Sequence, residues 1–234
     1  MCGRFTLHHS TEDIAERFTV EQVLMDLVPR YNIAPSQPVS AIVEHESRTL
    51  EPFKWGLVPS WAQDPALGSG MINARAESAS EKPAFRDAFR RRRCLIPASG
   101  YYEWKRVRDR SLPHYIHRAD QDPFVMAGLW EEWKAPGGAI VRTCAVLTTQ
   151  PNPFTAAIHQ RMPAILTGEE RQRWLDPQTD TGSLQGLLRP YPHDDLTAVE
   201  VGTEVNKAGF DDPSCIRVCP QELAGGGQLE LPFG

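Results

Sequence analysis

The sequence predicts an α+β fold, a single domain with a curled, mostly antiparallel β-sheet core flanked by short helices. Candidate strands outnumber candidate helices, and they come in runs without the regular alternation of a βαβ fold. The 234 residues are 41% hydrophobic, which suffices for one core in a chain of this length. We therefore expect one domain over residues 1–222 and a separate tail over residues 223–234.

Two helices are expected in the first hundred residues. Ser10 or Thr11 can cap a short helix in which Ile14 and Phe18 share one face. A second helix is predicted from about Ala84 to Arg92, because its aromatic residues recur at helical spacing.

A third helix should begin at Thr167, because Thr167 and Glu170 can form a capping box. Most of the remaining chain is predicted to form strands, with the 20 prolines and 17 glycines supplying turns. The predicted strands are Val39–Val43, His114–His117, Phe124–Leu129, Ile140–Thr148 and Ala164–Leu166.

Charge is distributed unevenly along the chain. The net charge of −5 argues against a uniformly basic nucleic-acid binder, but residues 86–110 contain nine basic and three acidic residues. A basic segment on an acidic body is typical of a localised phosphate-binding groove. A solvated, charged helix face would give the same pattern.

The cysteines and the hydropathy indicate the compartment. Five cysteines without a framework spacing favour reduced thiols. No apolar run approaches the roughly 18 residues that span a membrane, and no secretory signal is evident. We expect a cytoplasmic monomer, associated with the nucleoid if bacterial, that has no membrane contact, cofactor or metal.

Cys2 is the most informative residue, because it directly follows the initiator Met1. Removal of Met1 would leave a free α-amine and a thiol on adjacent carbons. Such a 1,2-aminothiol can condense with an aldehyde to a Schiff base and then close a thiazolidine ring. It can also act as an N-terminal nucleophile in acyl transfer. An ordinary second residue is the alternative.

Glu103 lies in a segment that alternates like a strand. A period of two places Tyr101, Glu103 and Lys105 on one face, with Tyr102 and Trp104 on the other. Glu103 should then lie at the edge of a core, where desolvation raises the pKa of a carboxyl group and suits it to proton transfer near neutral pH.

Two further segments place a polar residue and an arginine two positions apart. They are Asn73 with Arg75, and His159 with Arg161. In an extended chain, both side chains of each pair face the same way. Taken singly, a capping asparagine, a satisfied core histidine or a surface ion pair explains each equally well.

Six motifs in a fixed order resemble the SRAP family of abasic-site-processing proteins over roughly residues 1–222. They are Met1-Cys2-Gly3-Arg4-Phe5, Arg30-Tyr31-Asn32-Ile33-Ala34-Pro35, Trp55-Gly56-Leu57-Val58-Pro59-Ser60-Trp61, Ile72-Asn73-Ala74-Arg75-Ala76-Glu77, Gly100-Tyr101-Tyr102-Glu103-Trp104-Lys105 and His159-Gln160-Arg161-Met162-Pro163. The resemblance implies that the protein binds single-stranded DNA and captures the ring-opened aldehyde of an abasic site as a covalent crosslink.

The resemblance also implies four catalytic roles. Cys2 is the nucleophile, after autocatalytic removal of Met1, and Glu103 shuttles protons. His159 protonates the sugar oxygen as the ring opens, and Asn73 orients the amine or the sugar. Capture should proceed once per molecule, with strand cleavage by β-elimination as a further activity.

A second set of residues is implied to contact DNA. The set is Gly3, Arg4, Arg75, Thr148 and Arg161 at the backbone, with Pro35 and Trp61 on the bases. Guanidinium groups suit phosphate geometry, and stacking tolerates any base. Some relatives have a second tryptophan where this chain has Ala62. The resemblance therefore does not establish how firmly this chain holds one of the bases that flank the lesion.

The tail resembles a peptide that binds the bacterial sliding clamp. Residues 225–227 are three glycines, which suit a flexible tether, and Gln228, Leu229, Leu231 and Phe233 supply a glutamine and apolar side chains. A chain end with no function is the alternative.

Three other functions are compatible with a cysteine at position 2. Class II glutamine amidotransferases also begin with Cys followed by Gly, but further glutamine-pocket motifs are not found here. A non-covalent binder of single-stranded DNA and a peptidase acting on other proteins are the remaining alternatives.

Overall fold

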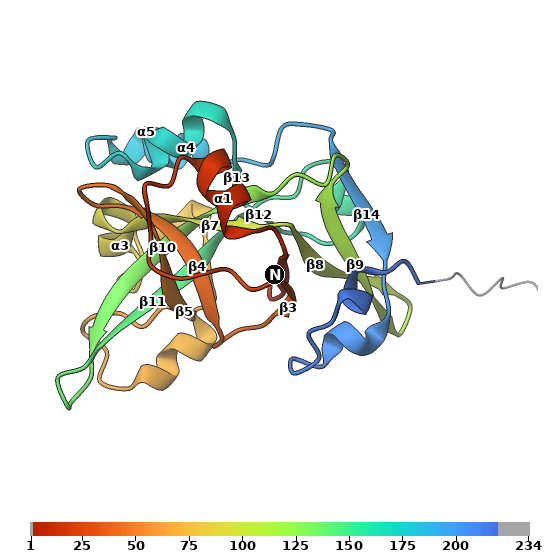
Figure 1. The fold of residues 1–234 in the computed structure, drawn as a ribbon, viewed down its shortest axis with the longest axis horizontal. Helices are drawn as coiled ribbons and strands as arrows, with labels where there is room; N and C mark the ends of the chain where they lie inside the picture. Colours follow the sequence, from red (N-terminus) through yellow and green to blue (C-terminus); the bar gives the residue numbers. More distant parts are fainter. Residues whose placement is uncertain (1, 220–234) are drawn as a thin grey trace, which may run out of the picture.

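The computed structural model describes residues 2–219. Two β-sheets lie beside each other, with short helices around their outer faces (Figure 1). The predicted α+β class is confirmed. Among residues 2–219, no helix is long and apolar enough to cross a membrane.

The larger sheet closes on itself. Its strands are β2 (Gln22–Val23), β4 (Pro38–Glu44), β5 (Arg48–Trp55), β6 (Asn73–Arg75), β7 (Arg93–Ala98), β10 (Phe124–Lys134), β11 (Ile140–Thr149), β12 (Met162–Pro163) and β13 (Ile165–Leu166). The order is β12-β11-β10-β7-β4-β5-β2, with β13 on β10 and β6 on β11. Because β5 also pairs with β11 in parallel, five of these strands form a ring, and the predicted curled sheet is a small barrel.

The smaller sheet is antiparallel and holds the start of the chain. Its strands are β14 (Leu196–Glu200), β9 (Arg110–Arg118), β8 (Gly100–Val107), β1 (Phe5–Leu7) and β3 (Arg30–Ile33), in that order. Only Ser99 separates β7 of the barrel from β8 of this sheet. A Cβ on Gly100 would lie 2.4 Å from the ring of Tyr115, so the crossing between the sheets needs a glycine.

The helices pack around the two sheets. They are α1 (Thr11–Phe18), α2 (Ala76–Ala79), α3 (Arg86–Arg91), α4 (Gly168–Leu175) and α5 (Thr181–Leu187), together with the 3₁₀ helices η1 (Pro65–Gly70), η2 (Thr155–Ala157), η3 (Thr203–Asn206) and η4 (Pro213–Ile216). All three predicted helices are present. Ser10 caps α1, and the capping box of Thr167 and Glu170 begins α4.

The sequence patterns missed several elements. The five predicted strands are found as β4, β9, β10, β11 and β13, most of them longer than expected. Helix α2 has too few residues to show helical spacing, and α5 contains two glycines, which are poor helix formers. Strands β5 and β7 were not predicted, although β7 is buried throughout.

The two faces of β8 pack in different cores. Tyr101 belongs to the main hydrophobic core, which includes most of the barrel strands, whereas Tyr102 belongs to a second cluster with Tyr115 and Val205. The predicted alternation along this strand is therefore confirmed.

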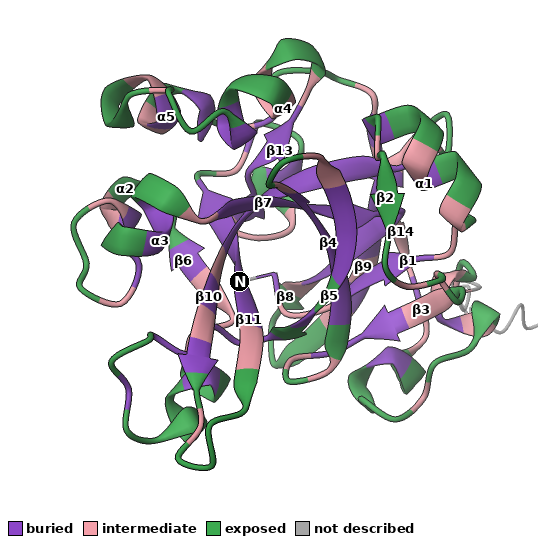
Figure 2. Cartoon of the chain, turned by 60° about the vertical axis from the view of Figure 1, so that its left-hand side comes forward, coloured by how far each residue is buried: buried purple, intermediate pink, exposed green. Residues whose placement is uncertain are grey.

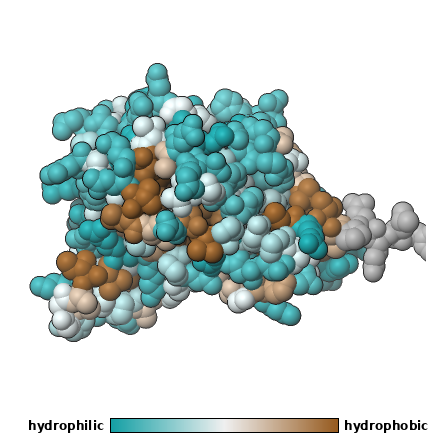
Figure 3. All heavy atoms as spheres, in the orientation of Figure 1, coloured by the Kyte–Doolittle hydropathy of each residue, from teal (hydrophilic) through white to brown (hydrophobic). Residues whose placement is uncertain are grey.

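Burial and hydropathy are distributed unevenly over the molecule. Figure 2 shows the buried strands at the centre and helices with exposed outer faces around them. Figure 3 shows one mostly hydrophilic face with separate hydrophobic patches.

Candidate active site

Cys2 lies inside the molecule, next to the smaller sheet. Its side chain is fully buried, and it belongs to the main hydrophobic core. Phe5 pairs with Tyr101, and the Tyr102 N–H donates to the Arg4 carbonyl at 2.9 Å. Continuing this antiparallel register brings the residues before Arg4 alongside Glu103.

Asn73 holds the backbone of Cys2. Its Nδ2 donates to the Cys2 carbonyl oxygen at 2.7 Å, and the parallel pairing of β6 with β11 sets its position opposite Val146. Its Oδ1 is buried and has no hydrogen-bond partner among the described residues. This oxygen is therefore an acceptor close to the backbone of Cys2.

Glu103 is a buried carboxylate on β8. It is 2% exposed, and burial raises the pKa of Glu103 to about 7. Burial and then the charge of Glu103 raise the pKa of the Cys2 thiol well above its usual range. The two groups therefore interact, and the thiol is neutral at physiological pH.

His159 lies beside Glu103, at the end of the turn that follows η2. Its Nδ1 is 3.6 Å from Oε1 of Glu103 and 3.1 Å from both the backbone oxygen and the backbone nitrogen of Arg161. The chain bends at Gln160, so this segment is not the simple extended strand considered from the sequence. Burial lowers the pKa of His159, which favours the neutral imidazole at pH 7.

A groove of about 720 Å³ opens from this pair toward the β8–β9 hairpin. Its lining residues are Glu103, Trp104, Arg106, Asp109, Arg110, Ser111, Ile158, His159 and Gln160. Sequence reasoning placed Arg106 and Arg110 only within the basic segment, without a relation to the site. The groove thus joins the buried carboxylate to the basic surface of the hairpin.

Three of the residues implied to contact the DNA backbone lie together. Arg75 pairs with Thr148 in the sheet, and Nη2 of Arg161 donates to the Thr148 carbonyl oxygen. Thr148 itself is fully buried. Arg161 also forms an ion pair with Glu77, a residue to which the sequence analysis gave no role.

Gly3 and Arg4 are half-buried. Nη1 of Arg4 donates to Oδ1 of Asn32 at 2.9 Å and to the carbonyl oxygen of Val205 at 2.6 Å. The structure therefore gives Arg4 an internal role, in which it ties the start of the chain to η3. A contact of Arg4 with DNA remains a prediction.

The residues implied to stack on bases lie in two turns. Pro35 is half-buried in the turn after β3, and Trp61 is 58% exposed in the turn after β5. Ala62 is buried, and its carbonyl oxygen accepts a hydrogen bond from Nε1 of Trp133 at 2.7 Å. Since Ala62 points inward and anchors this turn, Trp61 is the aromatic side chain that the turn exposes.

The basic segment divides between surface and interior. Helix α3 ends at Arg91, and Arg92 pairs with buried Glu131. Arg93 is buried and donates to four backbone carbonyl groups, which include those of Phe89 and Trp174. The basic segment is therefore not one continuous surface stripe.

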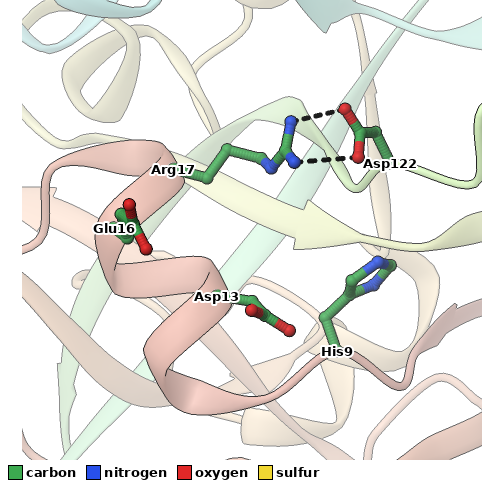
Figure 4. A pocket seen from close by; sticks show the side chains of 5 residues that line it. All are labelled: His9, Asp13, Glu16, Arg17 and Asp122. Atoms are coloured by element: carbon green, nitrogen blue, oxygen red, sulfur yellow. Dashed lines mark hydrogen bonds and ion pairs between the residues drawn. The ribbon is translucent and has the colours of Figure 1, made fainter.

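A second hollow, of about 580 Å³, lies against α1 (Figure 4). Its lining residues are His9, Asp13, Glu16, Arg17 and Asp122. Arg17 and Asp122 form a bidentate ion pair, in which Nη1 and Nη2 of Arg17 lie 2.6 and 2.8 Å from the two carboxylate oxygens of Asp122. None of the residues predicted to be functional lines this pocket.

Other predictions concern thiols, metals and the tail. Within residues 2–219, none of the five cysteines is paired in a disulfide bond. Across residues 2–219, no group of three or more His, Cys, Asp or Glu side chains could hold a metal ion. The predicted clamp-binding residues Gln228, Leu229, Leu231 and Phe233 lie outside the described residues.

Known proteins resemble the chain in sequence and in fold. The family model for SOS response associated peptidase (SRAP) matches residues 1–208. The abasic site processing protein YoqW of Bacillus subtilis is 44% identical over 92% of this chain and 99% of that protein. YedK of Escherichia coli, also called an abasic site processing protein, is 31% identical over 75% of this chain and 79% of its own.

A crystal structure of a protein from Bacteroides thetaiotaomicron has a TM-score of 0.84 and 26% sequence identity. The match covers 93% of this chain and all of that one. The family match, the identity to curated relatives and the shared fold agree with the six sequence motifs. The chain therefore belongs to the SRAP family.

Proposed function

We propose that this protein senses abasic sites in single-stranded DNA and captures their ring-opened aldehyde on Cys2. The observation that carries the proposal is the convergence of a second-residue thiol, an asparagine on its carbonyl and a carboxyl group whose pKa is near 7. The relatives named as abasic site processing proteins support the same conclusion.

The chemistry balances without a cofactor. Removal of Met1, which we assign to the protein itself, leaves the α-amine of Cys2, and an α-amine has a pKa of about 7.7 to 8. Its lone pair attacks C1′ of the aldehyde to give a carbinolamine. Loss of water gives the Schiff base, and the thiol sulfur then bonds to C1′, so that one aldehyde and one aminothiol yield a thiazolidine and water.

Glu103 suits both proton transfers. In its protonated form it can donate to the departing hydroxyl group, and in its ionised form it can accept the proton of the Cys2 thiol. A pKa of about 7 keeps both forms populated at neutral pH. The free acceptor oxygen of Asn73 can accept a hydrogen bond from the Cys2 amine and thereby orient its lone pair.

His159 serves the step before capture. The closed sugar must open before an aldehyde exists, and its ring oxygen needs a proton when the ring opens. His159 borders the groove beside Glu103. It can therefore receive a proton on the side of Glu103 and deliver it to the sugar ring oxygen in the groove. The same pair can support slow β-elimination of the strand.

We further propose that the strand runs along the groove. Arg75 and Arg161 hold its backbone, Arg106 and Arg110 continue the positive surface, and Trp61 stacks on a base. Each phosphate contact should add about 0.7 to the negative slope of log affinity against log salt. The protein then acts as a cytoplasmic monomer at the nucleoid, and its tail recruits it to a sliding clamp.

One experiment tests the central proposal. The purified protein is incubated with a single-stranded oligonucleotide carrying one abasic site, and the products are resolved by denaturing electrophoresis and intact mass spectrometry. We expect a shifted band that needs both Cys2 and the lesion, on a protein that lacks Met1. No shift from protein correctly trimmed to Cys2 would refute the proposal, and glutaminase activity would then indicate an amidotransferase.

The tail is tested separately. Titration of purified sliding clamp with a peptide of residues 225–234 should give saturable binding. An absence of binding at high micromolar concentration would refute clamp recruitment and would leave the proposal for Cys2 intact.

A further inference from the structure

Glu77 forms an ion pair with Arg161, one of the arginines that we propose to hold the DNA backbone. Nη1 and Nη2 of Arg161 lie 2.5 and 2.9 Å from the two carboxylate oxygens of Glu77. Nη2 also donates to the backbone oxygen of Thr148 at 2.5 Å. The Arg161 side chain is 17% exposed and that of Glu77 is 46% exposed, so Thr148 holds the guanidinium from inside and Glu77 covers it from outside.

This arrangement sets two anions in competition. A two-pronged contact to carboxylate uses the same planar fork of N–H groups that binds a phosphate. The hydrogen bond from Arg161 lowers the pKa of Glu77, so the carboxylate is ionised at neutral pH. A phosphate at Arg161 must either displace Glu77 or lie next to its negative charge.

Arg161 does not depend on Glu77 alone for its position. The contact with Thr148 joins it to β11, and its backbone contacts His159, which in turn lies beside Glu103. Loss of the Glu77 charge therefore leaves the guanidinium near its present position.

We propose that Glu77 weakens non-covalent binding of the DNA backbone at Arg161, so that retention on DNA depends on the covalent bond to Cys2. Undamaged single strands are then released quickly, whereas a strand with an abasic site is kept. This inference rests on the proposed function for its meaning, but the competition between carboxylate and phosphate can be measured on undamaged DNA.

The test compares Glu77→Gln with Glu81→Gln. Gln keeps an oxygen for Arg161 but removes the charge. Glu81 is exposed and lies four residues further along the chain, and in the described structure it has no ion pair, so its substitution removes the same charge without freeing an arginine. Affinity for an undamaged single-stranded oligonucleotide is measured by fluorescence anisotropy over a salt series.

We expect Glu77→Gln to bind about three- to tenfold more tightly at low salt and to steepen the salt dependence by about 0.7, as for one more phosphate contact. Glu81→Gln should change affinity less than about twofold, since Glu81 pairs with no arginine among the described residues and its removal frees no phosphate site. In Glu77→Gln/Arg161→Gln, the gain should vanish.

Equal effects of the two single substitutions would overturn the inference and indicate a general effect of net charge. Weaker binding by Glu77→Gln would also overturn it and make Glu77 a support for Arg161. Thermal unfolding of each variant shows whether it is folded. Crosslinking to an abasic oligonucleotide is measured on the wild type in parallel. Its absence would refute the proposed function, while the result on undamaged DNA would still decide the role of Glu77.

Discussion

Two polar hollows of this molecule contain the same kinds of side chain in different surroundings. The pocket at α1 holds Arg17 and Asp122, whose side chains are 41% and 35% exposed (Figure 4). The groove at the β8–β9 hairpin ends on Glu103, whose side chain is 3% exposed. Both hollows contain a histidine and carboxylates, with one arginine in the α1 pocket and two in the groove.

The difference shows that burial, rather than composition or size, prepares a carboxyl group for chemistry. Asp122 pairs with Arg17 at the surface, and such an exposed pair contributes little to stability. Glu103 has lost most of its hydration and has a raised pKa, which costs folding energy and suits proton transfer. The following substitutions test this contrast.

The largest effect is expected from Glu103→Gln on the rate of crosslinking. Gln fills the same space but cannot exchange a proton, and general acid–base catalysis contributes about 10²- to 10⁴-fold. The rate is measured on a single-stranded abasic oligonucleotide. Asp122→Asn makes the same chemical change in the α1 pocket and should leave the rate unchanged; equal rates for Glu103→Gln and wild type would remove Glu103 from the mechanism.

The second effect is on the pH dependence of stability. The pKa of Glu103 is about 7 in the folded protein, against an ordinary value of 4.5. Between these values the unfolded chain is ionised while the folded protein keeps its proton, so stability falls as pH rises toward 7 and is level above it.

Glu103→Gln should remove this loss and raise the free energy of unfolding at pH 8 by on the order of 3 kcal/mol. Urea unfolding at pH 5 and pH 8 measures it. If the free energy of unfolding differs between pH 5 and pH 8 by the same amount in the variant as in the wild type, Glu103 is not the group responsible.

A smaller effect is expected at Asn73. Asn73→Ala removes the donor to the Cys2 carbonyl oxygen, and one hydrogen bond contributes about 1 kcal/mol, so crosslinking should slow roughly five- to tenfold. Asn73→Asp keeps the shape and the acceptor oxygen but replaces the donor nitrogen by a second oxygen. If Asn73→Asp reacts at the full rate, the contact with Cys2 is not what Asn73 contributes.

The smallest effect is expected in the α1 pocket. Arg17→Met removes the ion pair with Asp122 but keeps an apolar chain of similar length. The free energy of unfolding should change by less than about 1 kcal/mol, and the crosslinking rate should not change. Thermal unfolding and the oligonucleotide assay measure both, and a large loss of crosslinking would mean that the two hollows are coupled.

Part of the site followed from local patterns. The alternation of Tyr101 and Tyr102 placed Glu103 at the edge of a core, and its pKa is raised as desolvation requires. The pairings of Asn73 with Cys2 and of Arg161 with Glu77 had no such signal. No sequence pattern indicated that Arg93 points inward. A run of arginines has the same sequence whether its side chains face water or donate to buried carbonyl groups.

The sequence by itself determined the caps of α1 and α4, the period of β8 and the thiol at the start of the chain, because these depend on neighbours within a few residues. Only the tertiary structure decided that β5 pairs with β11 to close the barrel. That closure, and the crossing at Ser99, bring Cys2, Asn73, Glu103 and His159 together. Such contacts depend on the path of the whole chain, because no local sequence pattern relates residues as far apart as Cys2 and Asn73.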